Sequence, residues 1–136
     1  MKLTEKQLIE FCAAQPNQIE DGEFLLTRKL GDHSWIKEGL RLGHFQSMVT
    51  KVDGVPRYLV IWHLNDQKFM MINAAALVGP ANPTENFSGL LPAMLDFARG
   101  TPGCQGVDCV TLRPGLAKLL LAQGWKPEGI YFSISV

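Results

Sequence analysis

Three side chains of this sequence could move a proton at neutral pH or hold an amine. His63 lies in the apolar run "RYLVIWHL", and an imidazole is the side chain best suited to act as a general base near pH 7. Glu85 lies in a proline-containing loop, where its carboxylate could orient a substrate amine. Tyr131 precedes Phe132 in the last apolar segment, so one of the two rings must face outward and Tyr131 could reach a cleft. These three residues are the candidate catalytic groups.

Each candidate also has a structural interpretation. His63 could be a hydrogen-bonded histidine of the core or of a sheet edge, and Glu85 could be a solvated carboxylate. Trp125 follows a glycine and could lie near an acceptor, or it could pack against the preceding helix. His33 and His44 are expected at the surface near turns.

The cysteines and histidines do not predict a metal site. Cys12, Cys104 and Cys109 form no CxxC pair and share no metal-ligand spacing with the histidines. We therefore expect free thiols and no metal, although a disulfide between Cys104 and Cys109 is sterically allowed.

Composition indicates one domain over residues 1–136, with 46% apolar residues and 13 basic against 13 acidic side chains. This balance does not favour nucleic acid or an anionic membrane as a partner. The charged start "MKLTEKQLIEFC" is unlike a secretory signal, and no run approaches the roughly 18 apolar residues of a membrane span. A cytoplasmic protein is therefore predicted.

The first third of the chain has a mixed pattern. Apolar residues at roughly helical spacing predict a helix over residues 5–14, ended by Pro16 and Asn17. Within residues 18–43, "EFLLTRKL" is compatible with a strand or with a helical turn. The stretch "DHSWIKEGLRLG" could form a short helix that ends at Gly43.

The rest of the chain is more regular. Residues 44–78 predict a meander of three strands, and a proline-containing loop leads to a helix over residues 87–99. A strand over 107–112, a helix that begins at Pro114 and stops at Gly124, and a last strand over 130–136 complete the chain. The predicted fold class is α/β (α+β): a mixed sheet in which an antiparallel strand meander is followed by helix-strand-helix-strand.

The element order, the stretch "LVGPANPTENFSGLL" and the helix "LAKLLLAQGW" resemble the GNAT superfamily of N-acyltransferases over about residues 44–136. The resemblance implies acetyl-CoA or another acyl-CoA as cofactor, held by backbone N–H groups of a loop and a helix N-terminus. It also implies that residues 18–43 help to form the acceptor wall. The implied cofactor-binding residues lie at the strand end, at the helix start and before the last helix: Val78, Gly79, Pro80, Asn86, Phe87, Ser88 and Arg113.

The chain departs from the pattern of this family at four positions. Pro83 stands where the family has Arg or Gln, and Asn86 stands where it has the first glycine. Leu120 stands where many relatives have a tyrosine as general acid, and leucine cannot donate a proton. Many relatives also have a carboxylate on the meander, where this chain offers only Asn73.

Two functions therefore remain open. The first is an acyl-CoA-dependent N-acyltransferase that modifies a small-molecule or peptide amine. The second, suggested by resemblance to small GNAT-like products of phages and mobile elements, is a non-catalytic structural, assembly or regulatory protein on the same frame. For this second function the last strand and Trp125 could offer an interface, and a homodimer is compatible with it.

Overall fold

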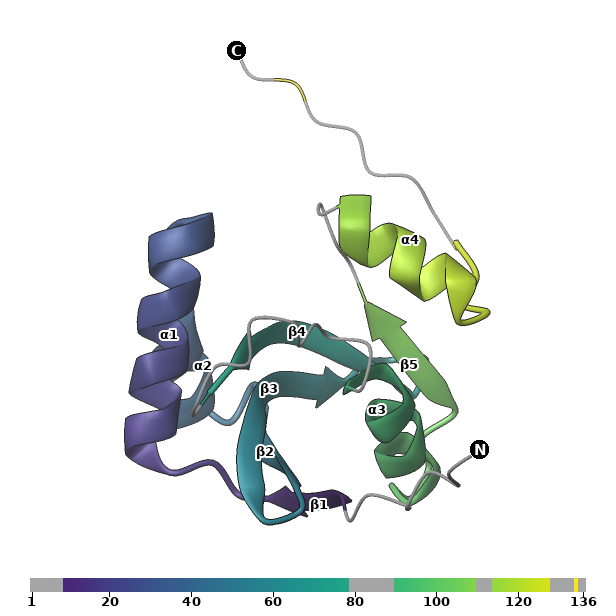
Figure 1. Cartoon of the computed structure of the whole chain (residues 1–136), viewed down its shortest axis with the longest axis horizontal. Coiled ribbons are helices and arrows are strands. Elements are labelled where there is room, and N and C mark those ends of the chain that lie inside the picture. The colour runs from purple at the N-terminus through teal and green to yellow at the C-terminus, as the bar shows by residue number, and fades with distance from the viewer. Residues whose placement is uncertain (1–8, 79–89, 110–113, 128–133, 135–136) are drawn as a thin grey trace, which may run out of the picture.

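The computed structural model describes residues 9–78, 90–109, 114–127 and 134. The described strands form one sheet in the order β1-β2-β3-β4-β5 (Figure 1). These strands are β1 (Ile9–Cys12), β2 (Gln46–Val52), β3 (Val55–Leu64), β4 (Phe69–Leu77) and β5 (Gly106–Cys109). The helices are α1 (Pro16–Leu30), α2 (Trp35–Arg41), α3 (Leu90–Arg99) and α4 (Pro114–Ala122). The predicted mixed α+β fold is confirmed.

The meander predicted over residues 44–78 is formed by β2, β3 and β4, which pair antiparallel in sequence order. The β2–β3 turn has both central residues in the left-handed region, Asp53 at φ 51° and Gly54 at φ 81°. An Asp-Gly pair adopts this conformation readily, and its twist matches that of the flanking strands. Local turn chemistry therefore sets the register of the hairpin.

The back half of the sheet is parallel. Helix α3 connects β4 to β5, and the two strands pair from Phe69↔Gly106 to Ile72↔Cys109. Strand β4 continues beyond this ladder to Leu77, and the N–H of Val78 still donates to the carbonyl of Arg57 in β3 at 2.9 Å. The two parallel strands therefore share only the first part of β4 within the described chain.

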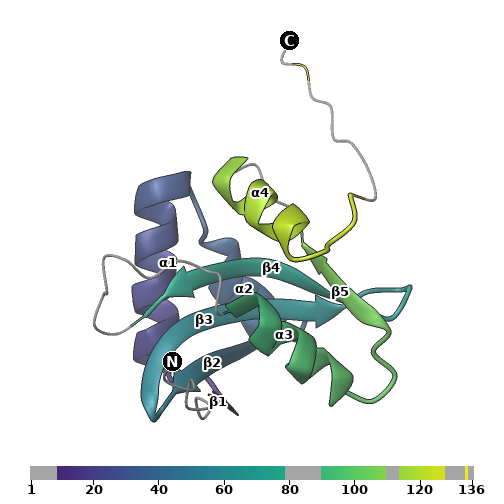
Figure 2. The same ribbon diagram turned by 45° about the vertical axis from the view of Figure 1, so that its right-hand side comes forward.

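Helices cover both faces of the sheet (Figures 1 and 2). On one face, Met94 and Ala98 of α3 pack in a buried cluster with Tyr58, Val60 and Met70. The other face carries a second cluster. It joins side chains of α1, α2 and three strands: Leu26, Ile36, Val49, Leu59, Ile61, Ala76 and Val78. Alternate residues of β3 thus belong to opposite cores, as expected for a central strand.

The helix predicted over residues 5–14 is wrong where the structure can test it. Residues Ile9–Cys12 form β1, which pairs antiparallel with β2, and Phe11 lies opposite Thr50. The ring of Phe11 packs on Phe97 of α3, with ring centroids 4.9 Å apart. The apolar residues of so short a segment are compatible with both the helical and the strand period. The segment becomes a strand because the edge of β2 offers it backbone hydrogen bonds.

Pro16 was expected to end a helix, but it is the first residue of α1. Proline is well suited to this position because its missing N–H would have no partner there. Both segments of residues 18–43 whose structure the sequence left undecided are helical. The stretch "EFLLTRKL" is part of α1, and "DHSWIKEGLRLG" contains α2, after which Gly43 has φ 77°.

The helix predicted to begin at Pro114 is confirmed as α4. Gly124 has φ 87°, and the N–H of Trp125 donates to the carbonyl of Leu120 at 3.0 Å, which closes the helix end. The predicted last strand over residues 130–136 falls almost wholly outside the described residues. In the part of the chain that the structure describes, no helix has the length and apolar character needed to cross a bilayer.

Candidate functional site

The structure brings His63 of β3 and Asn73 of β4 together. The Nδ1 atom of His63 lies 2.7 Å from Oδ1 of Asn73, and the pair is partly buried. His63 lies opposite Met71 in the ladder, so Asn73 is its diagonal neighbour on the same face. This face is the one covered by α1 and α2, because Ile61, two residues earlier in β3, belongs to that core.

A bulge in β4 explains why Asn73 can reach His63. Ile61 pairs with Ala74, whereas the next residue of β3, Trp62, pairs with Ile72, so Asn73 is the extra residue. An extra residue lets two consecutive side chains emerge on one face and re-aims one of them. Ala74 packs against the α1–α2 core, and Asn73 turns to the imidazole on that same face.

The tautomer of His63 follows from the orientation assigned to the Asn73 amide. In this orientation Oδ1 of Asn73 accepts the hydrogen of Nδ1 of His63. The lone pair of the neutral ring then lies on Nε2. An imidazole oriented by a neighbour in this way can accept a proton from a substrate at Nε2.

Aromatic rings extend from His63 toward the start of α2. The ring centroid of Phe45, just before β2, lies 5.9 Å from that of His63, and Trp35 lies 5.4 Å from Phe45 in an edge-on arrangement. The ring of His33 follows at 5.7 Å from Trp35. We call these four residues, His33, Trp35, Phe45 and His63, the aromatic row.

The His63–Asn73 pair lies just past the last described pairing of β4 with β5. The parallel ladder ends at Ile72↔Cys109, one residue before the bulge, and β4 then runs on to Leu77. No other described strand pairs with β4 on that side over residues 73–77. Alternate N–H and C=O groups of this stretch point away from β3 and can pair with an extended ligand, as a further strand would.

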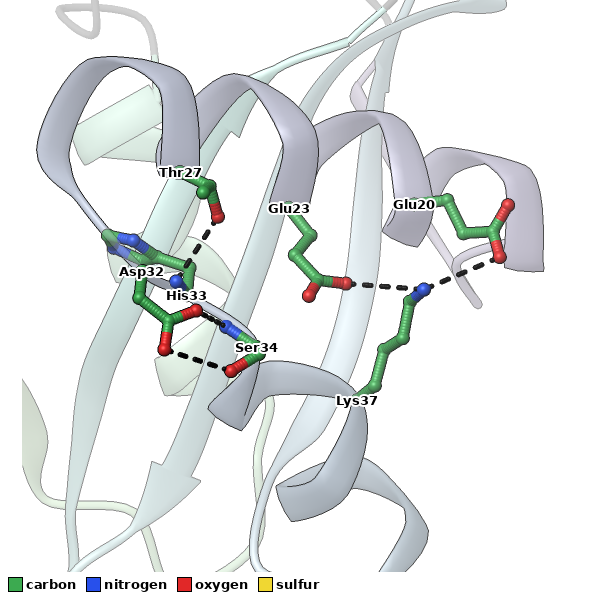
Figure 3. A network of polar contacts seen from close by, with 7 residues as sticks. All are labelled: Glu20, Glu23, Thr27, Asp32, His33, Ser34 and Lys37. Carbon is green, nitrogen blue, oxygen red and sulfur yellow. Dashed lines mark hydrogen bonds and ion pairs between the residues drawn. The ribbon is translucent and has the colours of Figure 1, made fainter.

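A polar network holds the corner between α1 and α2, at the outer end of the aromatic row (Figure 3). Nζ of Lys37 lies 3.5 Å from carboxylate oxygens of both Glu20 and Glu23, and these two charges raise the pKa of Lys37. Asp32 accepts hydrogen bonds from the backbone N–H and the hydroxyl of Ser34, and the backbone bond is the main reason that the pKa of Asp32 is lowered.

Within α2, the side chain of Arg41 pairs with that of Glu38. Its hydrogen bonds raise the pKa of Arg41 and lower that of Glu38. The Glu38–Arg41 pair lies within α2, whereas the Lys37 bridge links α2 to α1, and buried Ile36, next to Trp35, anchors α2 on the sheet.

Only two of the residues predicted for the site lie within the described chain. His63 is placed as above, and Val78 is buried in the α1–α2 core, where it can fix the end of β4 but offers no side-chain polar group. The other predicted residues lie outside the described residues: Gly79, Pro80, Glu85, Asn86, Phe87, Ser88, Arg113 and Tyr131.

Sequence reasoning named Asn73 but missed its role, and it missed the aromatic row. The signal for Asn73 was present, since it is the one polar residue between Phe69 and Val78. Leu120, at the position where the GNAT resemblance implies a tyrosine as general acid, is buried, and its side chain can only pack. The described residues hold no group of three or more metal-ligating side chains, and the described cysteines are free thiols.

No family model and no curated protein matches the sequence, whereas solved structures match its fold. A protein of Clostridium difficile 630 described as a "possible acetyltransferase" aligns with a TM-score of 0.62 and 12% identity, over 95% of this chain and 98% of that chain. The aminoglycoside N-acetyltransferase AAC(6')-Iy, in complex with a bisubstrate analog of CoA, aligns with a TM-score of 0.60 and 13% identity, over 95% and 99%.

A "predicted acetyltransferase" from Clostridium acetobutylicum with acetyl-CoA aligns with a TM-score of 0.61 and 9% identity, over 94% of this chain and 96% of that chain. At these identities the similarity shows the fold, which is GNAT-like.

Proposed function

We propose that this protein is an acyl-CoA-dependent N-acyltransferase in which His63 is the general base. The observation that carries the proposal is the His63–Asn73 pair, just past the last described pairing of β4 with β5. The GNAT-like fold supports it, since similar structures include complexes with acetyl-CoA and with a CoA bisubstrate analog.

The outer edge of β4 suits the extended arm of an acyl-CoA. Backbone groups of residues 73–77 have no described strand beside them, so they can form hydrogen bonds along such an arm. A thioester carbonyl placed near the bulge would lie beside His63 and Asn73. Backbone N–H groups can then stabilise the developing oxyanion, which is the largest catalytic contribution in many acyl transfers.

The chemistry then needs one base and no strong acid. The amine nitrogen forms a bond to the acyl carbon, the C–S bond breaks, and the proton of the amine passes to Nε2 of His63. The leaving group is a thiolate, and a thiol has an ordinary pKa of about 8.5. Such a group leaves without full protonation, so the leucine at position 120 is compatible with turnover. Holding amine and thioester together supplies much of the rate.

The first test is a thermal-shift titration with acetyl-CoA and with free CoA, confirmed by calorimetry. Ligand at about 100 times its dissociation constant should add about 2.7 kcal/mol to the free energy of unfolding. Thiol release from acetyl-CoA would then be followed with a panel of primary amines. We expect a saturable shift that the His63→Ala variant keeps, and amine-dependent thiol release that this variant loses.

The matched control is His44→Ala, because His44 is exposed and lies outside the aromatic row. This variant should keep both the shift and the release. A well-folded protein that gives no shift at millimolar acetyl-CoA would overturn the proposal and point to a non-catalytic role on the same fold.

A further inference from the structure

The aromatic row leads from the protein surface to the proposed base. Trp35, at the start of α2, is 37% exposed, whereas Phe45 and His63 are half-buried. Neighbouring ring centroids along the row lie 5.4 to 5.9 Å apart, within the range of favourable aromatic contacts. A molecule whose amine lies at His63 would therefore place its next atoms against Phe45 and Trp35.

The carboxylates around this path are bound by neighbouring groups. Glu20 and Glu23 both pair with Lys37 (Figure 3). Glu38 pairs with Arg41. Asp32 is the remaining carboxylate of this corner, and the N–H and hydroxyl of Ser34 occupy its two oxygens. Two glutamates share one lysine, and Asp32 keeps its charge when it accepts these hydrogen bonds, so the corner retains a net negative charge that can attract a cationic amine.

From the aromatic row and the net negative charge of this corner, we propose that the acceptor is a primary amine joined by a short aliphatic linker to an aromatic ring. The inference rests on the proposed N-acyltransferase function and names its acceptor class. In the bound acceptor, the amine lies at Nε2 of His63 and the ring packs on Phe45 and on the exposed side of Trp35. Ring contacts of this kind stabilise a complex beyond the area that they bury.

Trp35 is a specificity residue in this arrangement, because it contacts the ring of the acceptor but not the reacting atoms. Its position depends on α2, which Lys37 ties to α1 through Glu20 and Glu23. The row is therefore held by contacts that do not involve the acceptor. A preformed aromatic surface of this kind binds a ring with little loss of side-chain entropy.

The experiment compares 2-phenylethylamine, n-butylamine and spermidine as acceptors for acetyl-CoA. We expect kcat/KM for 2-phenylethylamine to exceed that for n-butylamine by about tenfold, as aromatic contacts of this size predict. Trp35→Ala should remove most of this preference and Trp35→Phe should restore it, while the thermal shift with CoA stays unchanged. Trp125→Phe is the control, since Trp125 follows α4 and is outside the row.

Binding is measured separately by the quenching of tryptophan fluorescence with 2-phenylethylamine alone. Quenching that Trp35→Ala abolishes, with no turnover of any amine, would overturn the N-acyltransferase function but support recognition of the aromatic ring. Turnover that is faster with spermidine or n-butylamine than with 2-phenylethylamine would overturn the inference and keep the function. Absence of both quenching and preference would also overturn the inference.

Discussion

The ring of Phe45 occupies the space in which Gly39 of α2 would carry a side chain. A Cβ atom built on Gly39 would overlap Cδ2 and Cε2 of this ring. Glycine at this position therefore lets α2 approach the sheet closely enough for Trp35, in its first turn, to meet Phe45 edge-on. Phe45 in turn contacts His63, so this close approach sets the geometry of the aromatic row.

Replacement of Gly39 by alanine should displace Phe45 and disturb the row. Overpacking of this kind costs about 1–3 kcal/mol of unfolding free energy, which urea denaturation would measure. The activity with aromatic amines should fall together with stability, because Phe45 and Trp35 move.

The matched control is Gly100→Ala, at the end of α3. A Cβ there has only ordinary contacts, the nearest at 3.7 Å. This variant should stay within about 0.5 kcal/mol of the parent protein. Equal stability losses in the two variants would show that the ring of Phe45 does not set the cost at Gly39.

The His63–Asn73 pair predicts a specific pattern of kinetic losses. His63→Ala should lower kcat/KM for the acceptor by about 10²- to 10⁴-fold, the usual contribution of a general base. Asn73→Ala should cost less, because it frees the ring orientation but leaves the base in place. In both variants the dissociation constant of acetyl-CoA, measured by calorimetry, should change little.

Asn73→Asp gives the sharper version of this test. A carboxylate beside Nδ1 favours the imidazolium over the neutral ring, and only the neutral ring accepts a proton. The acid limb of the pH–rate profile should therefore move to higher pH in Asn73→Asp. A profile identical to that of the parent protein would show that the two side chains are not coupled during catalysis.

The fold was predictable where local chemistry and tertiary packing favour the same element. The Asp53–Gly54 turn and the apolar strands around it predict the meander, and Pro114 with Gly124 brackets α4. The segment Ile9–Cys12 was not predictable from its own four residues. It becomes a strand because β2 offers a free edge and Phe97 offers a ring to pack on. That prediction failed because tertiary context overrode a weak local pattern.

The candidate site was predictable only in part. His63 could be named because a histidine in an apolar strand is unusual. Its contact with Asn73 depends on a bulge in β4, and no local sequence pattern predicts this bulge. The aromatic row joins residues from the start of α2, the start of β2 and β3, and its members are neighbours only after folding. The assignments to Glu85, Tyr131, Arg113 and the loop residues 79–88, and the single domain over residues 1–136, stay predictions.

The carboxylate of Asp32 predicts a pH dependence of stability. The backbone N–H of Ser34, and secondarily its hydroxyl, bind the ionised form and lower the pKa of Asp32. The folded pKa thus lies below the unfolded one, so the contribution is present above the ordinary pKa and is lost as pH falls through the folded value. The difference in melting temperature between the parent protein and Asp32→Asn should shrink between about pH 5 and about pH 2.

Ser34→Ala separates the two donors in that comparison. It removes the hydroxyl but leaves the backbone N–H, which is the larger cause of the shift. The Ser34→Ala protein should therefore keep most of the pH dependence. If the difference in melting temperature between the parent protein and Asp32→Asn stays constant across this pH range, the ionised Asp32 carboxylate does not stabilise the fold.

Two threonines should respond in opposite directions to the same substitution. Thr50 of β2 is 1% exposed between Phe11 and Tyr58, and its hydroxyl has no hydrogen-bond partner in the described chain. Burial of an unpaired hydroxyl costs about 1–3 kcal/mol, so Thr50→Val, which keeps the shape, should stabilise the protein by about 1 kcal/mol. Thr27 of α1 instead accepts the N–H of His33 at 3.2 Å, so Thr27→Val should destabilise it by about 0.5–1.5 kcal/mol. Urea denaturation at neutral pH measures both changes, and a loss of stability in Thr50→Val would reveal that its hydroxyl is satisfied in solution.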